Sequence, residues 1–294
     1  MLDAGNALFK TATPGDEQAR KRAEFILRSM GELGTSAMAV GSRDLAAGPE
    51  FLKKAAARAR VQLLSANLAD GSGKLLFSAA TKLSVAGVRV GLFGISPLQD
   101  ADGVRGSPPV QAALAEAHKL RGKVDLVIAL AAVPYADALQ LSKEAGSAVD
   151  FILQSHESRG TGIPQGDGRN FVIPTGERGR QLGRLELDLS GSGRWVDAGQ
   201  RARNEQLIKV LDVQIAEARK RFDSGSPEVK QSLSQTMQSF QARRDSLAKE
   251  SSSLAKAPRS LKLDFLTLGS EYPDDPALRA QVAVLEPQPS ASEP

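Results

Sequence analysis

The stretches "LDAGNALF" (residues 2–9) and "AVGSRDLAAG" (residues 39–48) decide how this chain folds. In each, a short apolar run ends in a turn that carries polar side chains: Asn6 in the first, and Ser42 and Arg43 in the second. Loops at the ends of buried strands are where α/β enzymes place binding and catalytic groups, because a rigid scaffold positions them. We therefore interpret the two turns as the edge of a candidate site.

Up to about residue 200, short apolar runs alternate with helical segments, which is typical of a layered α/β domain. The segment 16–34 has apolar residues three and four positions apart and ends in Gly34, as an amphipathic helix does. Residues 49–60 and 108–121 follow the same pattern. The expected strands are residues 36–40, 61–67, 88–96, 125–131, 150–155, 170–176 and 182–190.

A different region follows a break at residues 190–200, where the apolar period becomes helical. A turn at 223–228, with Pro227 suited to a first helical turn, separates two apolar stripes. We predict an antiparallel helical hairpin over 201–257, whose stripes pack on each other, self-associate or bind a protein partner. The first stripe is Leu207, Leu211, Ile215, Ala218 and Phe222, and the second is Val229, Leu233, Met237, Phe240 and Leu247.

We expect the whole chain to divide into four parts. Residues 1–200 form the main domain, and residues 201–257 form the hairpin. Residues 258–285 form a returning strand, around the alternating run 261–269, and a short helix that packs on the main domain. Residues 286–294 are rich in Pro and Ser and read as a disordered tail or linker.

The composition excludes several classes of function. The chain has 294 residues and no cysteine, so a disulfide framework, a thiolate nucleophile and a cysteine-ligated zinc are excluded. The net charge is +4 and the basic residues are scattered, which argues against nucleic acid as a partner. We expect no membrane span and find no signal peptide, so the chain as written would be cytoplasmic.

The order of the motifs resembles that of the calcineurin-like metallophosphoesterases, and in particular the N-terminal domain of the 5′-nucleotidase branch. The resemblance extends to about residue 190 and implies an α/β fold: a four-layer sandwich of two packed β-sheets flanked by helices, with the hairpin inserted or appended. It also implies two metal ions at the carboxyl ends of the strands. The matching landmarks are "DAGN" (3–6), "GSRDLAAG" (41–48), "SANL" (65–68), "VGLFGI" (90–95), "VDFILQSHES" (149–158) and "GERGRQLGRLELDLS" (176–190).

Most of the metal ligands that the resemblance implies are replaced. The bridging aspartate falls on Asn6, the amide ligand on Ser42, and the histidine that contacts phosphate on Arg43. A metal-ligating histidine falls on Ala132. The motif that opens the family's first strand has no counterpart, so we expect the natural protein to begin before Met1.

Few metal-ligand candidates remain. His156 matches the first histidine of the family's "GHxH" motif and Ser158 takes the place of the second, while Asp44 matches an acidic residue with a supporting role. The candidates that could still bind metal are Asp3, Asn6, Asp44 and His156. We expect no cofactor, or a divalent metal ion if there is one. The other histidine, His118, reads as a surface or half-buried helix residue.

Three functions stay open. The first is a non-catalytic module of the metallophosphoesterase fold that binds a ligand or has a structural role. The second is an active metal-dependent phosphoesterase or 5′-nucleotidase with a rearranged site. The third is a scaffold that assembles through the hairpin.

Two further expectations concern ligand and location. The first has two alternatives: Arg43 and Arg159 are expected to bind a phosphate group without metal, or Arg43 is expected to fill the vacated metal volume and pair with Asp44 or Asp3. Relatives with such a domain and a proline-rich linker belong to larger bacterial proteins. The resemblance therefore implies a periplasmic or secreted protein if the true N-terminus is missing.

Overall fold

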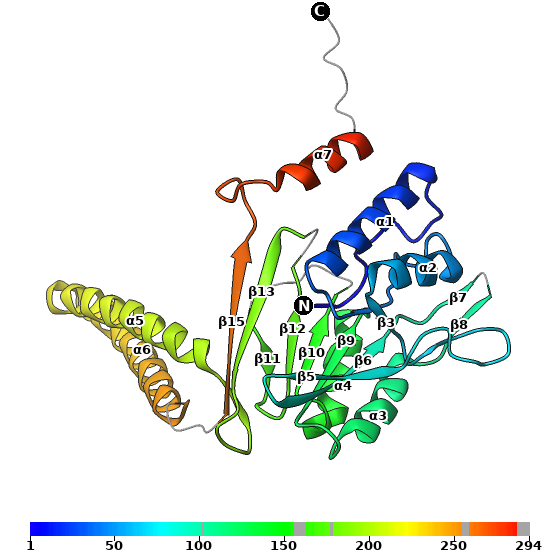
Figure 1. The fold of residues 1–294 in the computed structure, drawn as a ribbon. Coiled ribbons are helices and arrows are strands. Elements are labelled where there is room, and N and C mark those ends of the chain that lie inside the picture. Colours follow the sequence, from blue (N-terminus) through cyan, green and yellow to red (C-terminus); the bar gives the residue numbers. More distant parts are fainter. Residues whose placement is uncertain (102, 156–162, 177–178, 255–258, 287–294) are drawn as a thin grey trace, which may run out of the picture. The chain divides into compact units, whose positions relative to one another are not determined.

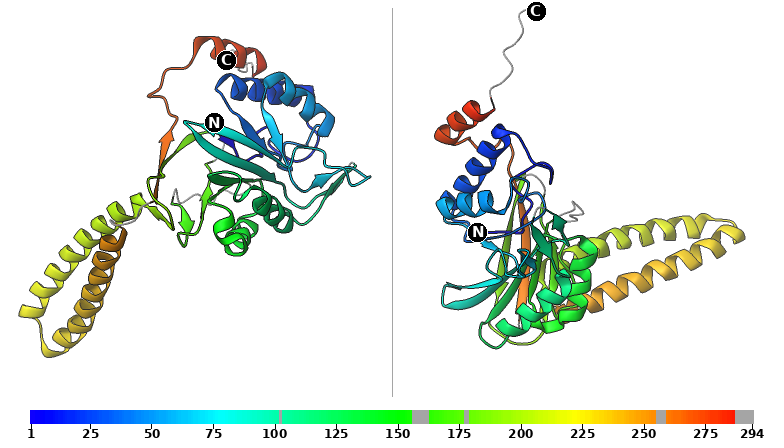
Figure 2. Two further views of the ribbon diagram at one scale, coloured as in Figure 1. Left: turned by 60° about the horizontal axis from the view of Figure 1, so that its bottom comes forward. Right: turned by 90° about the vertical axis from the view of Figure 1, so that its right-hand side faces the viewer.

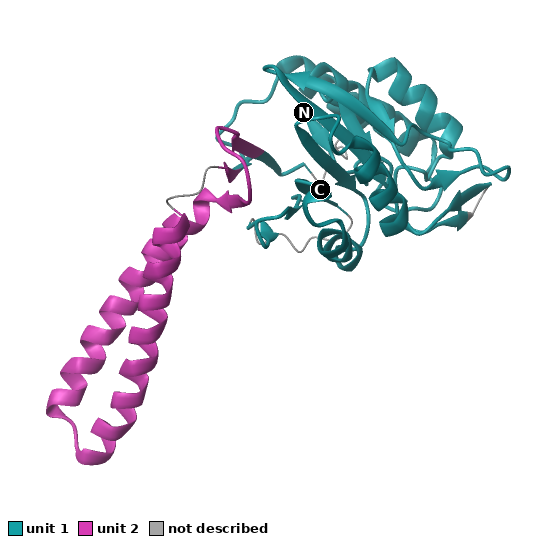
Figure 3. Ribbon diagram, turned by 90° about the horizontal axis from the view of Figure 1, so that it is seen from below, with its two compact units in different colours: residues 1–183, 265–294 teal, residues 184–264 magenta. Residues whose placement is uncertain are grey.

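The computed structural model describes residues 1–101, 103–155, 163–176, 179–254 and 259–286. The chain divides into two compact units, of which unit 1 comprises Met1–Gly183 and Phe265–Pro294, and unit 2 comprises Arg184–Asp264 (Figure 3). The helices of unit 1 are α1 (Glu17–Glu32), α2 (Pro49–Ala59), α3 (Pro109–Leu120), α4 (Tyr135–Ala145) and α7 (Pro276–Leu285), with a 3-10 turn at Gly146–Ala148. Its strands are β1 (Leu2–Asp3), β2 (Ala37–Ala39), β3 (Gln62–Leu64), β4 (Leu68–Ala69), β5 (Ala80–Val85), β6 (Val88–Ile95), β7 (Asp100–Ala101), β8 (Val104–Gly106), β9 (Leu126–Ala131), β10 (Phe151–Gln154), β11 (Gln165–Gly166) and β12 (Phe171–Pro174).

The largest sheet of unit 1 has the strand order β11-β12-β10-β9-β6-β5. Its four central strands are parallel, and the edge strands β5 and β11 are antiparallel to their neighbours. Every residue of β9, "LVIALA", is buried, because a central parallel strand is covered on both faces. One face packs on α3 and α4 through a core that includes Val127, Ala129, Ala113 and Leu141.

A second, three-stranded sheet has the order β1-β2-β3 with parallel neighbours. Its core joins Met38 of β2 to Leu27 of α1 and Leu52 of α2. The two sheets approach closely, since a Cβ on Gly94 of β6 would lie 2.2 Å from the Leu64 carbonyl oxygen of β3. Helices α1 and α2 lie on one side of the sheets and α3 and α4 on the other (Figures 1 and 2). The predicted α/β sandwich with two sheets and flanking helices is confirmed.

Unit 2 consists mainly of a helical hairpin. Helix α5 (Ala198–Ser224) and helix α6 (Pro227–Leu254) connect β14 (Trp195–Asp197) to β15 (Arg259–Thr267), and β14 and β15 pair in parallel. With β13 (Gln181–Asp188) they form a sheet of order β13-β15-β14, so both β13 and β15 cross the boundary between the units. The carboxylate of Asp197 caps α5 by accepting the Gly199 N–H at 2.8 Å.

Two residues of the predicted hairpin stripes are exposed: Val229 of the second stripe, at 44%, and Leu207 of the first. Leu207 is 45% exposed, whereas Ile208 is half-buried and Leu211 is buried. The inward-facing positions repeat at alternating steps of three and four residues, so Ile208 and not Leu207 shares a face with Leu211. No helix in the described ranges combines the length and the apolar character that a bilayer span requires.

Candidate functional site

A buried carboxylate joins the two turns that the sequence identified. Asp44 is 0% exposed, and its Oδ2 accepts the N–H groups of Asn6 at 2.7 Å and Gly41 at 2.8 Å. Its Oδ1 accepts those of Ala7 at 2.9 Å and Leu8 at 3.1 Å. A carboxylate has about four lone-pair positions, so the backbone occupies all of them. Asp44 therefore holds the turn after β1 against the turn after β2.

Asn6 lies at the centre of this arrangement in a left-handed conformation, with φ of 62°. Asparagine tolerates this conformation better than most residues. Its side chain is 7% exposed, and its Oδ1 accepts the N–H of Arg43 at 3.2 Å. The Nδ2 group is buried and has no hydrogen-bond partner among the described residues. A Cβ on Gly41 would lie 2.3 Å from Asn6 Oδ1, so the glycine makes room for this side chain.

The ends of β9 and β10 lie against the first turn. A Cβ on Gly5, whose φ is 91°, would lie 2.7 Å from the carbonyl oxygen of Ala39 and 3.0 Å from the Cβ of Ala132. The Ser155 hydroxyl, just after β10, donates to the Ala4 carbonyl oxygen at 2.5 Å. The structure thus brings Ala132 next to the turn that contains Asn6, at the edge that the sequence predicted.

Burial governs the ionisation of the two acidic residues. Burial raises the pKa of Asp44 to about 7, an effect that exceeds the opposing effect of its amide donors, and the charge of Asp3 raises it further. Burial also raises the pKa of Asp3, although its Oδ1 accepts the Gly5 N–H at 2.7 Å. The site therefore disfavours additional negative charge unless a cation compensates for it.

The predicted pairing of Arg43 with Asp44 or Asp3 is wrong. Arg43 is half-buried, and no ion pair joins it to either carboxylate in the part of the chain that the structure describes. For Asp44 the reason is that backbone amides already occupy its oxygens. Ser42 lies beside Arg43 and is half-buried.

Other predicted residues have simpler outcomes. His118 is exposed on α3, as expected. His156, Ser158 and Arg159 lie outside the described residues, so their place relative to Asn6 stays a prediction.

The described residues do not fit a pair of divalent cations. None of them forms a group of three or more His, Cys, Asp or Glu side chains that could hold a metal ion. Two-metal sites need carboxylate oxygens and neutral imidazoles as ligands. Here backbone amides occupy the oxygens of Asp44, Asn6 offers one neutral oxygen that already accepts an N–H, and Ala132 has no donor atom.

A polar residue that sequence reasoning missed lies at the end of β10. The Gln154 side chain is fully buried, and its Nε2 donates to the carbonyl oxygen of Val133 at 2.9 Å. Its Oε1 has no partner among the described groups. The sequence did contain a sign of this buried residue: a glutamine directly follows the apolar run "FIL", in a strand otherwise without polar side chains.

The "SANL" motif has a structural role. Asn67 is 1% exposed, and its Nδ2 donates to the carbonyl oxygens of Ser96 at 2.9 Å and Ser107 at 3.0 Å. Its Oδ1 accepts the Ser96 N–H at 2.8 Å. The Ser65 hydroxyl lies 2.8 Å from that of Ser96. This network ties the loop after β3 to the ends of β6 and β8.

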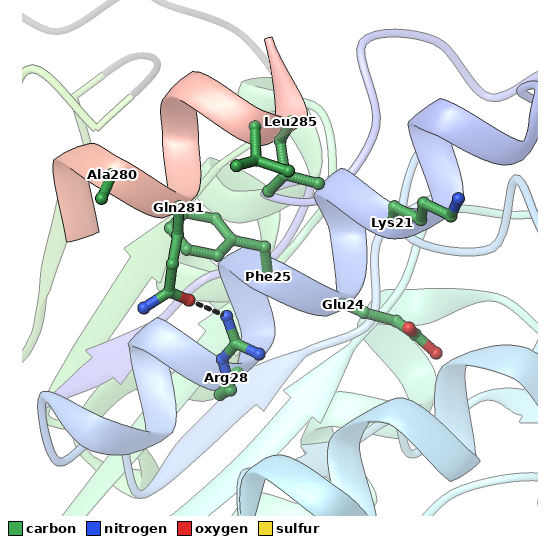
Figure 4. Close-up of a pocket in the computed structure, with 8 residues that line it drawn as sticks. Lys21, Glu24, Phe25, Arg28, Ala280, Gln281 and Leu285 are labelled. Atoms are coloured by element: carbon green, nitrogen blue, oxygen red, sulfur yellow. Dashed lines mark hydrogen bonds between the residues drawn. The ribbon is translucent and has the colours of Figure 1, made fainter. Parts of the chain in front are cut away.

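A separate cavity of about 460 Å³ lies between α1 and α7 (Figure 4). The Arg28 guanidinium donates to Gln281 Oε1, the Gln18 amide donates to the Leu285 carbonyl oxygen, and Arg22 pairs with Glu286 at 3.1 Å. No strand-tip residue lines the cavity, so it is distinct from the candidate site. Its lining residues are Lys21, Glu24, Phe25, Arg28, Ala280, Gln281, Val284 and Leu285.

Comparison with solved structures identifies the fold. The chain is similar to the sulfate thiohydrolase SoxB of Thermus thermophilus, with a TM-score of 0.55 and 20% identity over 63% of this chain and 35% of that one. It is similar to a 5′-nucleotidase precursor, also of Thermus thermophilus, with a TM-score of 0.51 and 22% identity over 63% of this chain and 41% of that one. It is also similar to the calcineurin-like phosphoesterase YfkN of Bacillus subtilis, with a TM-score of 0.50 and 19% identity over 63% of this chain and 70% of that one.

The chain therefore has the fold of the calcineurin-like metallophosphoesterases. The structures similar to it include 5′-nucleotidases, in agreement with the predicted resemblance. The chain spans 35% and 41% of the length of the first two proteins. Its sequence matches no protein-family model and none of the curated proteins compared with it.

Proposed function

We propose that unit 1 is a non-catalytic domain of the metallophosphoesterase fold, with a binding or structural role. The observation that supports this most directly is the pair of replaced ligand positions at the strand tips: Asn6 offers one neutral oxygen, which already accepts the Arg43 N–H, and Ala132 has no donor atom. In two-metal phosphoesterases the ions activate water and stabilise the phosphoryl oxygens. A carboxylate whose lone pairs are used by the backbone has none left for an ion, and Asn6 and Ala132 supply no charged ligand beside it.

The test is metal content together with hydrolysis. The protein is purified with Mn²⁺ and Zn²⁺ present, dialysed and analysed for metal, and then assayed with p-nitrophenyl phosphate, its bis ester and 5′-AMP. We expect metal well below one ion per chain and no hydrolysis above the buffer rate. Metal-dependent hydrolysis that His156→Ala removes and His118→Ala keeps would instead support an active enzyme with a rearranged site.

A scaffold role for the hairpin is the second candidate. Helix α6 has no buried residue, and α5 exposes Leu207, Val210 and Val213 by 45%, 53% and 59%. These three residues recur every three positions and form an apolar strip on the outer face of α5. The test is sedimentation velocity of a variant with Val210→Lys and Val213→Lys, with Lys209→Ala as control. If the double lysine variant loses assemblies larger than a dimer and the Lys209→Ala control keeps them, this role is supported. Identical sedimentation profiles for the two variants refute it.

A further inference from the structure

Strand β13 (Gln181–Asp188) presents a long exposed edge. It is the outer strand of the sheet β13-β15-β14, and among the described strands it pairs with β15 alone. Its residues 181–184, 186 and 188 are exposed. The N–H and C=O groups along such an edge are a template for another strand.

Several of the usual protections against edge pairing are missing from β13. Natural edges are protected by prolines, by charged side chains, especially lysine, or by being very short. The sequence "QLGRLELD" has no proline, and the two charged side chains near its centre, Arg184 and Glu186, are of opposite sign. They lie on the same face of the strand and form an ion pair at 2.6 Å. Leu185 and Leu187 are half-buried on the opposite face.

The charge pattern is complementary to itself in one antiparallel register. With Leu185 opposite the same residue of a second copy, Arg184 faces Glu186 and Glu186 faces Arg184. On the other face, Leu187 then lies opposite Gly183. A shift of two residues in either direction places two arginines or two glutamates directly opposite each other, which is destabilising.

We propose that β13 pairs antiparallel with β13 of a second copy of this chain, with Leu185 on the two-fold axis. The sheet then continues from one copy into the other, and the interface repeats the same patch on both, as a two-fold dimer requires. Two cross-strand Arg184–Glu186 pairs fix the register, and the leucine face is continuous across the axis.

The absence of native cysteine allows a direct test of this register. In the proposed dimer the Cα atoms of the two copies of residue 185 lie about 5 Å apart. Those of residue 187 lie on the order of 13 Å apart, since four residues separate them along the strand. Leu185→Cys and Leu187→Cys are matched variants, because both leucines are half-buried on one face. With a short bis-maleimide, we expect Leu185→Cys to crosslink into a dimer faster than Leu187→Cys. Equal rates, or no crosslinking of either variant, overturn the proposal.

A charge exchange tests the cross-strand pairs. On the Leu185→Cys background, Arg184→Glu or Glu186→Arg alone places like charges opposite each other and slows crosslinking about tenfold. Mixing these two variants restores crosslinking between unlike chains, because each chain then supplies the complementary charge. Far-UV circular dichroism verifies that every variant is folded. Crosslinking unaffected by single exchanges, or not restored by mixing, overturns the proposal and leaves any association to another surface such as the hairpin.

Discussion

Replacing Asp44 by alanine is expected to destabilise unit 1 by about 4 kcal/mol at pH 8. The change leaves the N–H groups of Asn6, Ala7, Leu8 and Gly41 without their acceptor. An orphaned buried donor costs about 1 to 3 kcal/mol, so four cost roughly 8 kcal/mol. The substitution also removes a charged group whose burial raises its pKa from 3.8 to about 7. At about 1.4 kcal/mol per pKa unit this relief is roughly 4 kcal/mol, which leaves the net loss stated.

The measurement is urea unfolding followed by two probes. Far-UV circular dichroism reports on the whole chain, whereas the single tryptophan, Trp195, lies in unit 2. We expect Asp44→Ala to shift the circular-dichroism transition and to leave that of Trp195 fluorescence in place. Glu271→Ala, an exposed acidic residue of unit 1, is the control and should change stability by less than about 0.5 kcal/mol.

An isosteric variant separates the hydrogen bonds from the packing. Asp44→Asn keeps the shape of the side chain but can accept from only two of the four N–H groups, and its NH2 faces the other two. We expect a loss of at least about 2 kcal/mol at pH 8. A loss below about 1 kcal/mol in both Asp44 variants would refute the reasoning, because the amides would then find other acceptors or water.

Three further outcomes are expected. Since the folded-state pKa of Asp44 is raised to about 7, its stabilising contribution is complete below 3.8 and is lost as the pH rises towards 7. The free energy of unfolding should therefore fall by about 2 to 3 kcal/mol between about pH 5 and pH 8, and Asp44→Asn should remove this slope. Gly41→Ala should cost roughly 1 to 3 kcal/mol by displacing Asn6, whereas Gly71→Ala, at a site with open space, should not, as thermal unfolding will show. Asn67→Ala should cost roughly 3 kcal/mol in urea unfolding, because it leaves three backbone groups without partners; a loss below about 1 kcal/mol contradicts this role.

The sequence predicted the central strands because buried parallel strands are continuous apolar runs, and "LVIALA" in β9 is the clearest case. It did not predict β5 (Ala80–Val85), whose "ATKLSV" is largely exposed at the edge of the sheet. Helix α4 (Tyr135–Ala145) was also missed, because the apolar run of β9 continues directly into it. Edges and junctions escape prediction since their residues are set by tertiary neighbours and not by a local period.

Prediction of the candidate site from the sequence was limited in the same way. Sequence order placed Asn6, Arg43 and Ala132 near one edge of the fold, and the structure brings their turns together. It could not show that Asp44 is held by backbone amides, because N–H groups exist at every non-proline position and leave no residue signature. The predicted ion pair between Arg43 and Asp44 is wrong for this reason, because backbone amides and not a side chain occupy the oxygens of Asp44.

The fold of unit 1 is stabilised by contacts that do not involve a metal ion. The sheets are held by apolar cores that include Leu27, Met38 and Leu141, none of which depends on a bound ion. At the strand tips, Asp44 joins the turns after β1 and β2 by accepting four backbone N–H groups. The proposed absence of metal ligands at Asn6 and Ala132 is therefore compatible with an intact turn. Under the proposed function, a metal site at this edge would require new ligands at Asn6 and Ala132, while the backbone contacts of Asp44 could stay as they are.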